Sequence, residues 1–147
     1  VVFDLYAGTG TIGMVLASRA KEVYSVEIVP EASEDNIRNL AKNNIKNVTV
    51  INAPVEKLLE EWKKEGKTPD VIVIDPPRAG MHPDAPGILR DFNPKEIIYV
   101  SCNPATLARD IPLIAPNGEY RVTDITPVDM FPHTFHIENV VLLVLIN

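Results

Sequence analysis

Short apolar runs alternate along the chain with segments in which apolar residues recur every three or four positions. The runs are almost continuously hydrophobic, which is typical of strands covered on both faces of a sheet. They predict strands at residues 1–6, 22–28, 48–52, 71–75, 96–101, 120–125 and 138–146. The recurring segments predict helices at about residues 11–20, 30–45, 55–62 and 105–111, each with one apolar face.

The order of these elements predicts an α/β fold with a mainly parallel, doubly wound sheet. Strands that alternate with helices of this length form βαβ units, which place helices on both faces of the sheet. The last two strands have no helix between them, so we expect an antiparallel pair and an antiparallel edge strand near the C-terminus. The loop at residues 78–86, with Gly80, Pro83 and Pro86, is the segment expected to move most.

Composition narrows the class of protein. The 147 residues are 46% apolar, which is enough for one globular domain with its own core. The net charge of −6 lacks the basic excess of a self-sufficient nucleic-acid binder, but it is compatible with an enzyme whose basic surface lies on another domain. A single cysteine excludes an internal disulfide and a multi-cysteine metal site, and it fits a reducing cytoplasm.

The two ends of the sequence add two expectations. The longest apolar stretch, residues 140–146, is too short to span a bilayer, so no membrane partner is expected. The chain starts directly in a strand-like run, and we therefore expect residues 1–147 to be one domain of a longer protein.

A glycine-rich turn follows the first predicted strand in the stretch DLYAGTGTIG. Gly8, Gly10 and Gly13 let the backbone turn tightly and approach a ligand at the start of a helix. Glu27 ends the second strand, where a carboxylate can accept both hydroxyls of a ribose. The glycine pattern alone suits NAD as well as other nucleotide ligands.

Two acids favour S-adenosylmethionine over NAD. Asp4 lies four positions before Gly8, where its carboxylate could organise the turn or meet a cationic amino-acid group. S-adenosylmethionine carries such a group and has no pyrophosphate. Asp75 ends the fourth strand in VIVIDPPRAG, at the ligand-binding edge of such a sheet, and two prolines fix its direction. This acid could bind the edge of a nitrogen-rich base, or it could simply cap a turn.

The only cysteine, Cys102, ends the fifth strand in the stretch YVSCNPATLARD. Cysteines are commonly small apolar fillers of a core. Here Asn103 and Pro104 start a helix directly after the thiol, and a thiol at a helix N-terminus is more readily held as the thiolate. Arg109, two turns further on, could add positive potential or simply lie on the surface.

Taken together, five motifs resemble the RNA (uracil-5-)-methyltransferases: DLYAGTGTIG, SVE, DPPRAG, VSCNPATLARD and DMFPHTFHIENVVLL. They occur in order over essentially the whole chain. The wording DMFPHT is most similar to the branch that methylates uridine in 23S ribosomal RNA, with transfer-RNA enzymes as the alternative. The resemblance implies a Rossmann-like class I methyltransferase fold, S-adenosylmethionine as cofactor and RNA as substrate.

The resemblance also implies roles for particular residues. Cys102 matches the nucleophile that adds to carbon 6 of uracil, and Glu138 matches the general base that removes the proton from carbon 5. Asp75 matches an acid at the boundary between methyl donor and base. The target uridine must be flipped out of any stacked structure to reach such a site.

Further positions match the methyl-donor site of the family. Besides Asp4 and Asp75, the expected cofactor-binding residues are Tyr6, Gly8, Gly10, Thr11, Glu27 and Asn52. Asn52 is the candidate for the adenine contact, and here the chain departs from the usual pattern, since many methyltransferases carry an acid where this chain has Asn52 and Ala53.

Several features depart from the full family pattern. The glutamine-bearing segment before the first strand and the RNA-binding domains are not in this sequence, so we expect RNA to bind through other domains. His133 and His136 lack a third ligand, so no metal is expected, and His133 is expected to fix the loop that presents Glu138. Arg78 could meet a phosphate or cap a loop.

Two other functions fit parts of the sequence. An amino-methyltransferase would hold an exocyclic amine with Asp75 and its prolines, but it needs an aromatic residue where this chain has Arg78. A non-catalytic binding domain could keep the fold, but Cys102 and Glu138 count against it.

Overall fold

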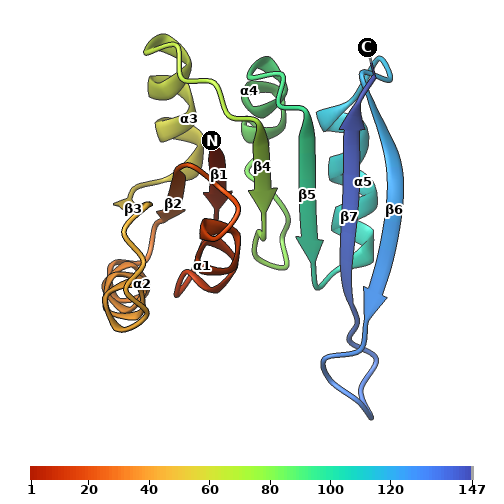
Figure 1. Cartoon of the computed structure of the whole chain (residues 1–147). Coiled ribbons are helices and arrows are strands. Elements are labelled where there is room, and N and C mark those ends of the chain that lie inside the picture. Colours follow the sequence, from red (N-terminus) through yellow and green to blue (C-terminus); the bar gives the residue numbers. More distant parts are fainter. Residues whose placement is uncertain (147) are drawn as a thin grey trace.

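The computed structural model describes residues 1–146, which form seven strands and five helices (Figure 1). In chain order these elements are β1 (Val2–Leu5), α1 (Thr11–Ala17), β2 (Val23–Glu27), α2 (Pro30–Lys42), β3 (Val48–Asn52), α3 (Val55–Lys64), β4 (Val71–Ile74), α4 (Ala85–Asp91), β5 (Glu96–Ser101), α5 (Pro104–Ile114), β6 (Tyr120–Val128) and β7 (Glu138–Leu145).

All seven strands form one sheet in the order β3-β2-β1-β4-β5-β7-β6 (Figure 1). The first five strands are parallel, and β7 is antiparallel to both β5 and β6. The predicted parallel sheet with an antiparallel pair near the C-terminus is therefore confirmed. The antiparallel strand itself, β7, lies one place in from the edge, and the edge strand β6 runs in the same direction as β5.

Hydrophobicity explains why β7 takes the inner place. Its sequence ENVVLLVL buries Val141 and Leu143 completely, whereas β6, YRVTDITPV, is exposed along most of its length. An inner strand loses water on both edges and both faces, so the more apolar strand gains more by occupying it.

The helix α4 was missed by the sequence prediction, which had no helix between β4 and β5. Pro86 and Gly87 conceal it, because proline and glycine usually break helices. In the first turn, however, proline is tolerated, since the amide it lacks would have no partner there. Burial of Ala85 and Leu89 against the sheet then stabilises the helix.

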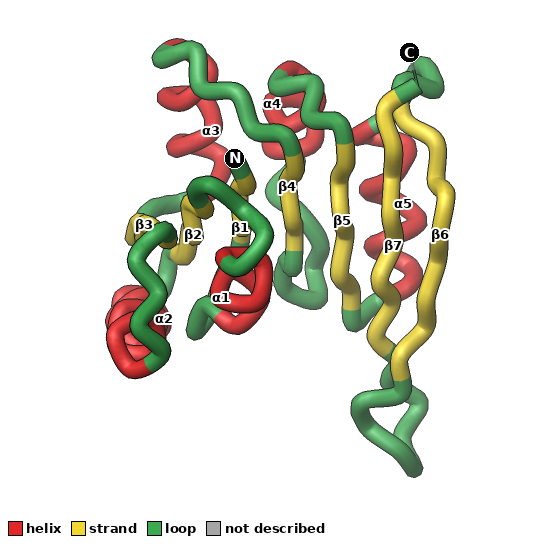
Figure 2. The backbone as a smooth tube through the Cα atoms, in the orientation of Figure 1, coloured by secondary structure: helices red, strands yellow, loops and turns green. Residues whose placement is uncertain are grey.

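Helices cover both faces of the sheet, as predicted (Figure 2). On one face α3, α4 and α5 enclose the larger core, in which the Phe3 ring lies 4.3 Å from that of Trp62 and 5.6 Å from that of Phe92. On the other face α1 packs on a smaller cluster that includes Val23 and Val73.

A buried carboxylate fastens the loop after β4 to α5. Asp110 is only 1% exposed, and its Oδ2 accepts hydrogen bonds from the Tyr99 hydroxyl at 2.6 Å and the Met81 amide at 2.9 Å. Its Oδ1 accepts from Arg109 Nε at 2.8 Å. Gly80 adopts φ +83°, and a Cβ there would lie 2.6 Å from Asp110 Oδ2. The loop is thus tied down at Met81, while the mobility expected of residues 78–86 stays a prediction.

Replacing Asp110 with alanine is expected to lower the free energy of unfolding by about 2–4 kcal/mol, because buried donors on Tyr99 and Met81 lose their acceptor. Chemical denaturation followed by far-ultraviolet circular dichroism measures this loss. The exposed Asp129 is the matched control, and its replacement with alanine should change stability by less than about 0.5 kcal/mol. Equal losses in the two variants would contradict the anchoring role of Asp110.

Candidate active site

The direction of the strands brings the predicted site residues to one edge of the sheet. The parallel strands β2, β1, β4 and β5 all end at this edge, and the antiparallel β7 begins there (Figure 1). Glu27, Gly8, Asp75, Cys102 and Glu138 follow or occupy these strand ends, so they are arranged along the edge in that spatial order. The Asp75 amide donates to the Leu5 carbonyl at 3.2 Å, which ties the glycine turn to the acid beside it.

The glycine turn between β1 and α1 is supported from behind by α2. Gly8 and Gly10 have φ values of +55° and +84°, a left-handed conformation that glycine adopts without strain. A Cβ on Gly10 would overlap the fully buried Asn36 side chain, and Asn39 Nδ2 donates to the Thr9 carbonyl at 3.1 Å. Sequence reasoning missed Asn36, although a polar residue on the buried face of α2 was a usable signal.

Glu27 is fixed at the end of β2 by two backbone amides. Its Oε2 accepts from the Gly8 amide and its Oε1 from the Val29 amide, both at 2.8 Å. A carboxylate has about four lone-pair sites, so each oxygen keeps one acceptor site for a ligand. Asn52 lies next to it, donating from Nδ2 to the Glu27 carbonyl at 2.9 Å. The structure therefore brings together Gly8, Glu27 and Asn52, three of the predicted cofactor-binding residues.

Asp4 lies under the start of α1 and is 1% exposed. Its Oδ2 accepts from the Ser25 hydroxyl at 2.9 Å, while Oδ1 is buried with no hydrogen-bond partner among residues 1–146. Burial raises the pKa of Asp4 from its ordinary 3.8 to about 6, and nearby acids, including Asp75, add to the rise. A half-satisfied acid in this position is suited to a polar ligand group at the turn.

Tyr6 and Thr11 flank the glycine turn. Tyr6 has φ +60°, packs against the larger core, and its buried hydroxyl has no partner within residues 1–146. Burial raises the pKa of Tyr6 to about 12. Thr11 is exposed at the first position of α1. Asp4 Oδ1 and the Tyr6 hydroxyl are therefore two buried polar atoms near the turn that have no partner within residues 1–146.

The three predicted catalytic residues line one cavity of about 410 Å³. Ser101 of β5 pairs with Asn139 of β7, so the next residues, Cys102 and Glu138, lie across from each other just past the end of the ladder. Partial burial raises the pKa of Asp75 above its ordinary value, and the negative charge of Glu138 raises it further. The rest of the wall is apolar and consists of Val100, Val128, Met130, Phe131 and Val140.

Asn103 holds Cys102 at the start of α5. Its side-chain oxygen accepts from the Ala105 amide at 3.0 Å, which caps the helix, and its Nδ2 donates to the Arg78 carbonyl at 3.1 Å. One side chain thus joins the cysteine segment to the loop after Asp75.

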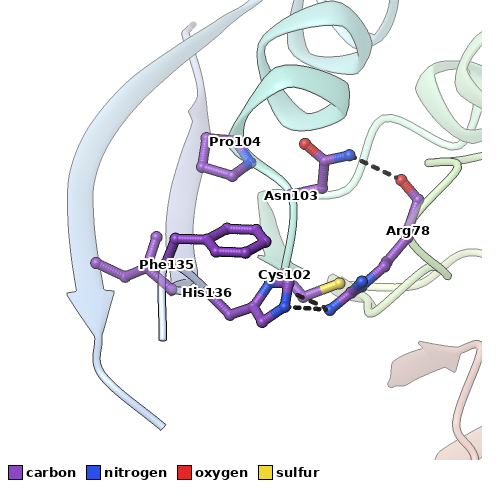
Figure 3. Close-up of a pocket in the computed structure, with 7 residues that line it drawn as sticks. Arg78, Cys102, Asn103, Pro104, Phe135 and His136 are labelled. Atoms are coloured by element: carbon purple, nitrogen blue, oxygen red, sulfur yellow. Dashed lines mark hydrogen bonds between the residues drawn. The ribbon is translucent and has the colours of Figure 1, made fainter. Parts of the chain in front are cut away.

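A second cavity, of about 250 Å³, meets the first at Cys102. Figure 3 shows the Arg78 side chain reaching to the His136 ring, with Phe135 beyond that ring; Arg78 Nη2 lies 3.2 Å from His136 Nδ1. The sequence left the roles of two arginines undecided. Arg109 donates hydrogen bonds to Asp110 and to the Ala79 carbonyl, whereas Arg78 lines this cavity.

The histidine-containing loop before β7 is braced by Thr134. Its hydroxyl donates to the Phe131 carbonyl at 2.8 Å and accepts from the His136 amide at 3.2 Å. The expected role of His133 in fixing this loop stays a prediction. Residues 1–146 contain no cluster of three or more histidine, cysteine or acidic residues that could hold a metal ion. Over the same residues, no helix is both long enough and apolar enough to cross a membrane.

Residues 2–146 match the protein family described as tRNA (Uracil-5-)-methyltransferase. The chain is 49% identical over 142 residues to an uncharacterized RNA methyltransferase of Bacillus cereus, covering 97% of this chain and 31% of the relative. It is 49% identical over 144 residues to another from Bacteroides thetaiotaomicron, with the same two shares of 97% and 31%.

A solved structure agrees. The tRNA (uracil-54, C5)-methyltransferase of Pyrococcus abyssi, in complex with S-adenosyl-L-homocysteine, superposes with a TM-score of 0.81 at 36% identity, covering 97% of this chain and 34% of that chain. The chain spans about a third of the length of these relatives. Its sheet has the Rossmann-like class I methyltransferase architecture that the motifs implied. By fold and by a match over nearly its whole length, the chain belongs to the RNA (uracil-5-)-methyltransferase family.

Proposed function

We propose that residues 1–147 form the catalytic domain of an enzyme that methylates carbon 5 of a uridine in RNA. The observation that carries this proposal is the cavity shared by Cys102, Asp75 and Glu138, at the same sheet edge as the glycine turn. A thiol, a base and an acid in a largely apolar cavity are the groups that this reaction requires.

The proposed methyl donor is S-adenosylmethionine, which supplies a methyl group on a positively charged sulfur. Support comes from the Pyrococcus abyssi relative, which was solved with S-adenosyl-L-homocysteine. Glu27 is held with free acceptor sites for the ribose hydroxyls, and the Asp4 Oδ1 atom behind the turn awaits a polar partner. The backbone at Gly8, Gly10 and Thr11 would line the amino-acid end.

Residues near Glu27 complete the proposed donor site. Ile28, which sequence reasoning missed, is 59% exposed directly after Glu27 and offers an apolar surface for the adenine. Asn52 uses its Nδ2 on the Glu27 carbonyl, so its contribution includes bracing the ribose-binding acid. Tyr6 packs behind the turn and holds its shape.

The proposed chemistry begins with Cys102. Its thiolate adds to carbon 6 of uracil; the electrons of the carbon 5–carbon 6 double bond form a carbon 4–carbon 5 double bond, and those of the carbon 4 carbonyl move onto oxygen 4 to give an enolate. Carbon 5 then forms a bond to the methyl carbon, whose bond to the donor sulfur breaks with both electrons returning to sulfur. Asp75 binds the edge of the base, beside the donor.

Glu138 completes the reaction. Its carboxylate takes the proton from carbon 5, the double bond re-forms, and the bond from carbon 6 to Cys102 breaks to return the thiolate. Glu138 faces Cys102 across the end of the β5–β7 ladder, so both residues reach the same ring. The proton on Glu138 then passes to solvent.

The proposed substrate is 23S ribosomal RNA in the cytoplasm, on the strength of the DMFPHT motif at residues 129–134. Transfer RNA is the alternative, since the matching family and the Pyrococcus abyssi relative are both named for tRNA. With a net charge of −6, RNA affinity is proposed to come from domains outside this chain. Mapping 5-methyluridine in RNA from cells that lack the gene distinguishes the two: the RNA that loses the methyl group is the substrate.

Replacing Cys102 with alanine is expected to abolish covalent trapping of RNA that carries 5-fluorouridine at the target position. Fluorine cannot leave as a proton would, so the parent protein, expressed from its complete gene, stays attached to the RNA. Denaturing gel electrophoresis detects the adduct. The variant should bind S-adenosylmethionine within about twofold of the parent by calorimetry, because the thiol acts on the base. Trapping by the variant at the parent's level would overturn the mechanism.

Replacing Glu138 with glutamine is expected to lower kcat by about 10²- to 10⁴-fold, the usual loss for a missing general base. Because the first addition does not need Glu138, the adduct with ordinary uridine RNA should accumulate with its methyl group in place, and mass spectrometry of the complex measures it. Loss of adduct and methyl transfer together would contradict the assignment.

Replacing Asp4 with asparagine is expected to stabilise the ligand-free protein at pH 7 by about 1–3 kcal/mol. The pKa of Asp4 is about 6 when folded and near 3.8 when unfolded, so ionisation opposes folding as pH rises through this window. The gain should nearly vanish near pH 3, where both states bind the proton. Urea denaturation at the two pH values tests this, and an equal gain at both would contradict it.

A further inference from the structure

The histidine-containing loop between β6 and β7, residues 129–137, exposes the Phe135 side chain to solvent in the cavity that also contains Cys102. Phe135 is 90% exposed, although most large apolar side chains of this chain are packed against the sheet. Its ring lies 4.3 Å from that of His136 at an interplanar angle of 43°, and His136 in turn contacts Arg78 (Figure 3). The loop extends beyond the edge of the sheet at which the strands end (Figure 1).

Arg78 keeps its positive charge available in this cavity. Its guanidinium contacts the His136 ring, and among the ion pairs of residues 1–146 none joins Arg78 to a carboxylate. Arg109, by contrast, is neutralised by Asp110 at 2.7 Å. The loop backbone that carries Arg78 is fixed, because Asn103 holds its carbonyl. A guanidinium without a carboxylate partner, beside the rings of His136 and Phe135, is suited to an anionic and aromatic ligand.

Single-stranded nucleic acid has this chemistry. Its bases stack on exposed aromatic and guanidinium planes, and its phosphates pair with arginine. The cavity also meets the proposed uracil cavity at Cys102, so a nucleotide bound here would be next to the uridine under attack.

We propose that Phe135, His136 and Arg78 form a second subsite that binds a nucleotide adjacent to the target uridine in the same RNA strand. Phe135 stacks on the neighbouring base, His136 orients the Phe135 ring and the guanidinium, and Arg78 pairs with a phosphate. These side chains are positioning residues, since none of them touches the reacting atoms. The proposal rests on the proposed function and deepens it, because it explains how the RNA strand is held while the target uridine is flipped into the cavity.

The test uses the protein expressed from its complete gene. The target uridine is the one that loses its methyl group when the gene is deleted, and a synthetic RNA carries the sequence around it. Two further RNAs carry an abasic nucleotide immediately before or after that uridine. Methyl transfer from radiolabelled S-adenosylmethionine gives kcat and KM for each RNA. The variants are Phe135→Ala, Phe135→Trp and, as a matched control, Ile125→Ala, which removes a 59% exposed side chain from β6.

Phe135→Ala is expected to raise KM for the intact RNA by about 5- to 100-fold, the range that loss of one base–aromatic stack produces, with kcat changed less than about threefold. One abasic RNA should show the same rise with the parent protein and no further rise with Phe135→Ala, because both changes remove the same contact. Phe135→Trp should restore KM, and Ile125→Ala should leave it unchanged.

The subsite is overturned if Phe135→Ala leaves KM at the parent's value, or if the effects of Phe135→Ala and of both abasic nucleotides simply multiply. Failure of the proposed function has a different signature, namely that no uridine loses its methyl group on deletion or that the parent protein transfers no methyl group to the mapped RNA. A rise in KM that Ile125→Ala reproduces would also overturn the subsite, since it would reflect general disturbance of the hairpin.

Discussion

Strand direction is the constraint on which the site depends. A parallel sheet gathers the carboxyl ends of its strands at one edge, and β7 adds its own beginning there because it runs the other way. Residues separated by up to 130 positions, from Gly8 to Glu138, therefore share one rim. If β7 were parallel to β5, Glu138 would lie at the opposite end of the sheet and could not face Cys102.

Hydrogen-bonded polar side chains then set the finer positions along this rim. Glu27 is held by two amides, Asp110 by a hydroxyl, an amide and a guanidinium, and Asn103 joins two segments with one side chain. The two buried carboxylates, Glu27 and Asp110, accept hydrogen bonds on both oxygens, so their orientation is fixed at little cost in stability. Asp4 differs, because one of its oxygens has no partner within residues 1–146 and burial opposes its charge. Such a group lowers stability unless a ligand or ordered water completes it.

The two cavities that meet at Cys102 divide the proposed work. One is mostly apolar around Asp75 and Glu138. This suits a flat base and a reaction in which the base becomes negatively charged for a short time. The other is lined by Arg78 and the rings of Phe135 and His136, which suits the RNA strand that carries this base. Under this proposal, a chain with a net charge of −6 would contribute local RNA contacts through Arg78 and the two rings.

Much of this protein was determined by the sequence alone. The period of the apolar residues predicted all seven strands and four of the five helices found in residues 1–146. The predicted strand ends placed Glu27, Asp75 and Cys102 at the ligand edge of the sheet, whereas Glu138 was singled out only by resemblance to a family. These features are local, because periodicity and strand ends are written in consecutive residues. The catalytic roles came from resemblance to a family and remain to be tested.

Only the tertiary structure decided the rest. The helix α4 depends on burial of Ala85 and Leu89 that outweighs the weak propensity of Pro86 and Gly87, and the inner place of β7 depends on competition between two strands. The contacts of Asn36 with Gly10 and of Asp110 with Met81, like the cavity beside Phe135, join residues far apart in the chain. Local pattern carries no information about such pairs, since their distance is fixed only when helices pack on the sheet and close-packing leaves each side chain one place to lie.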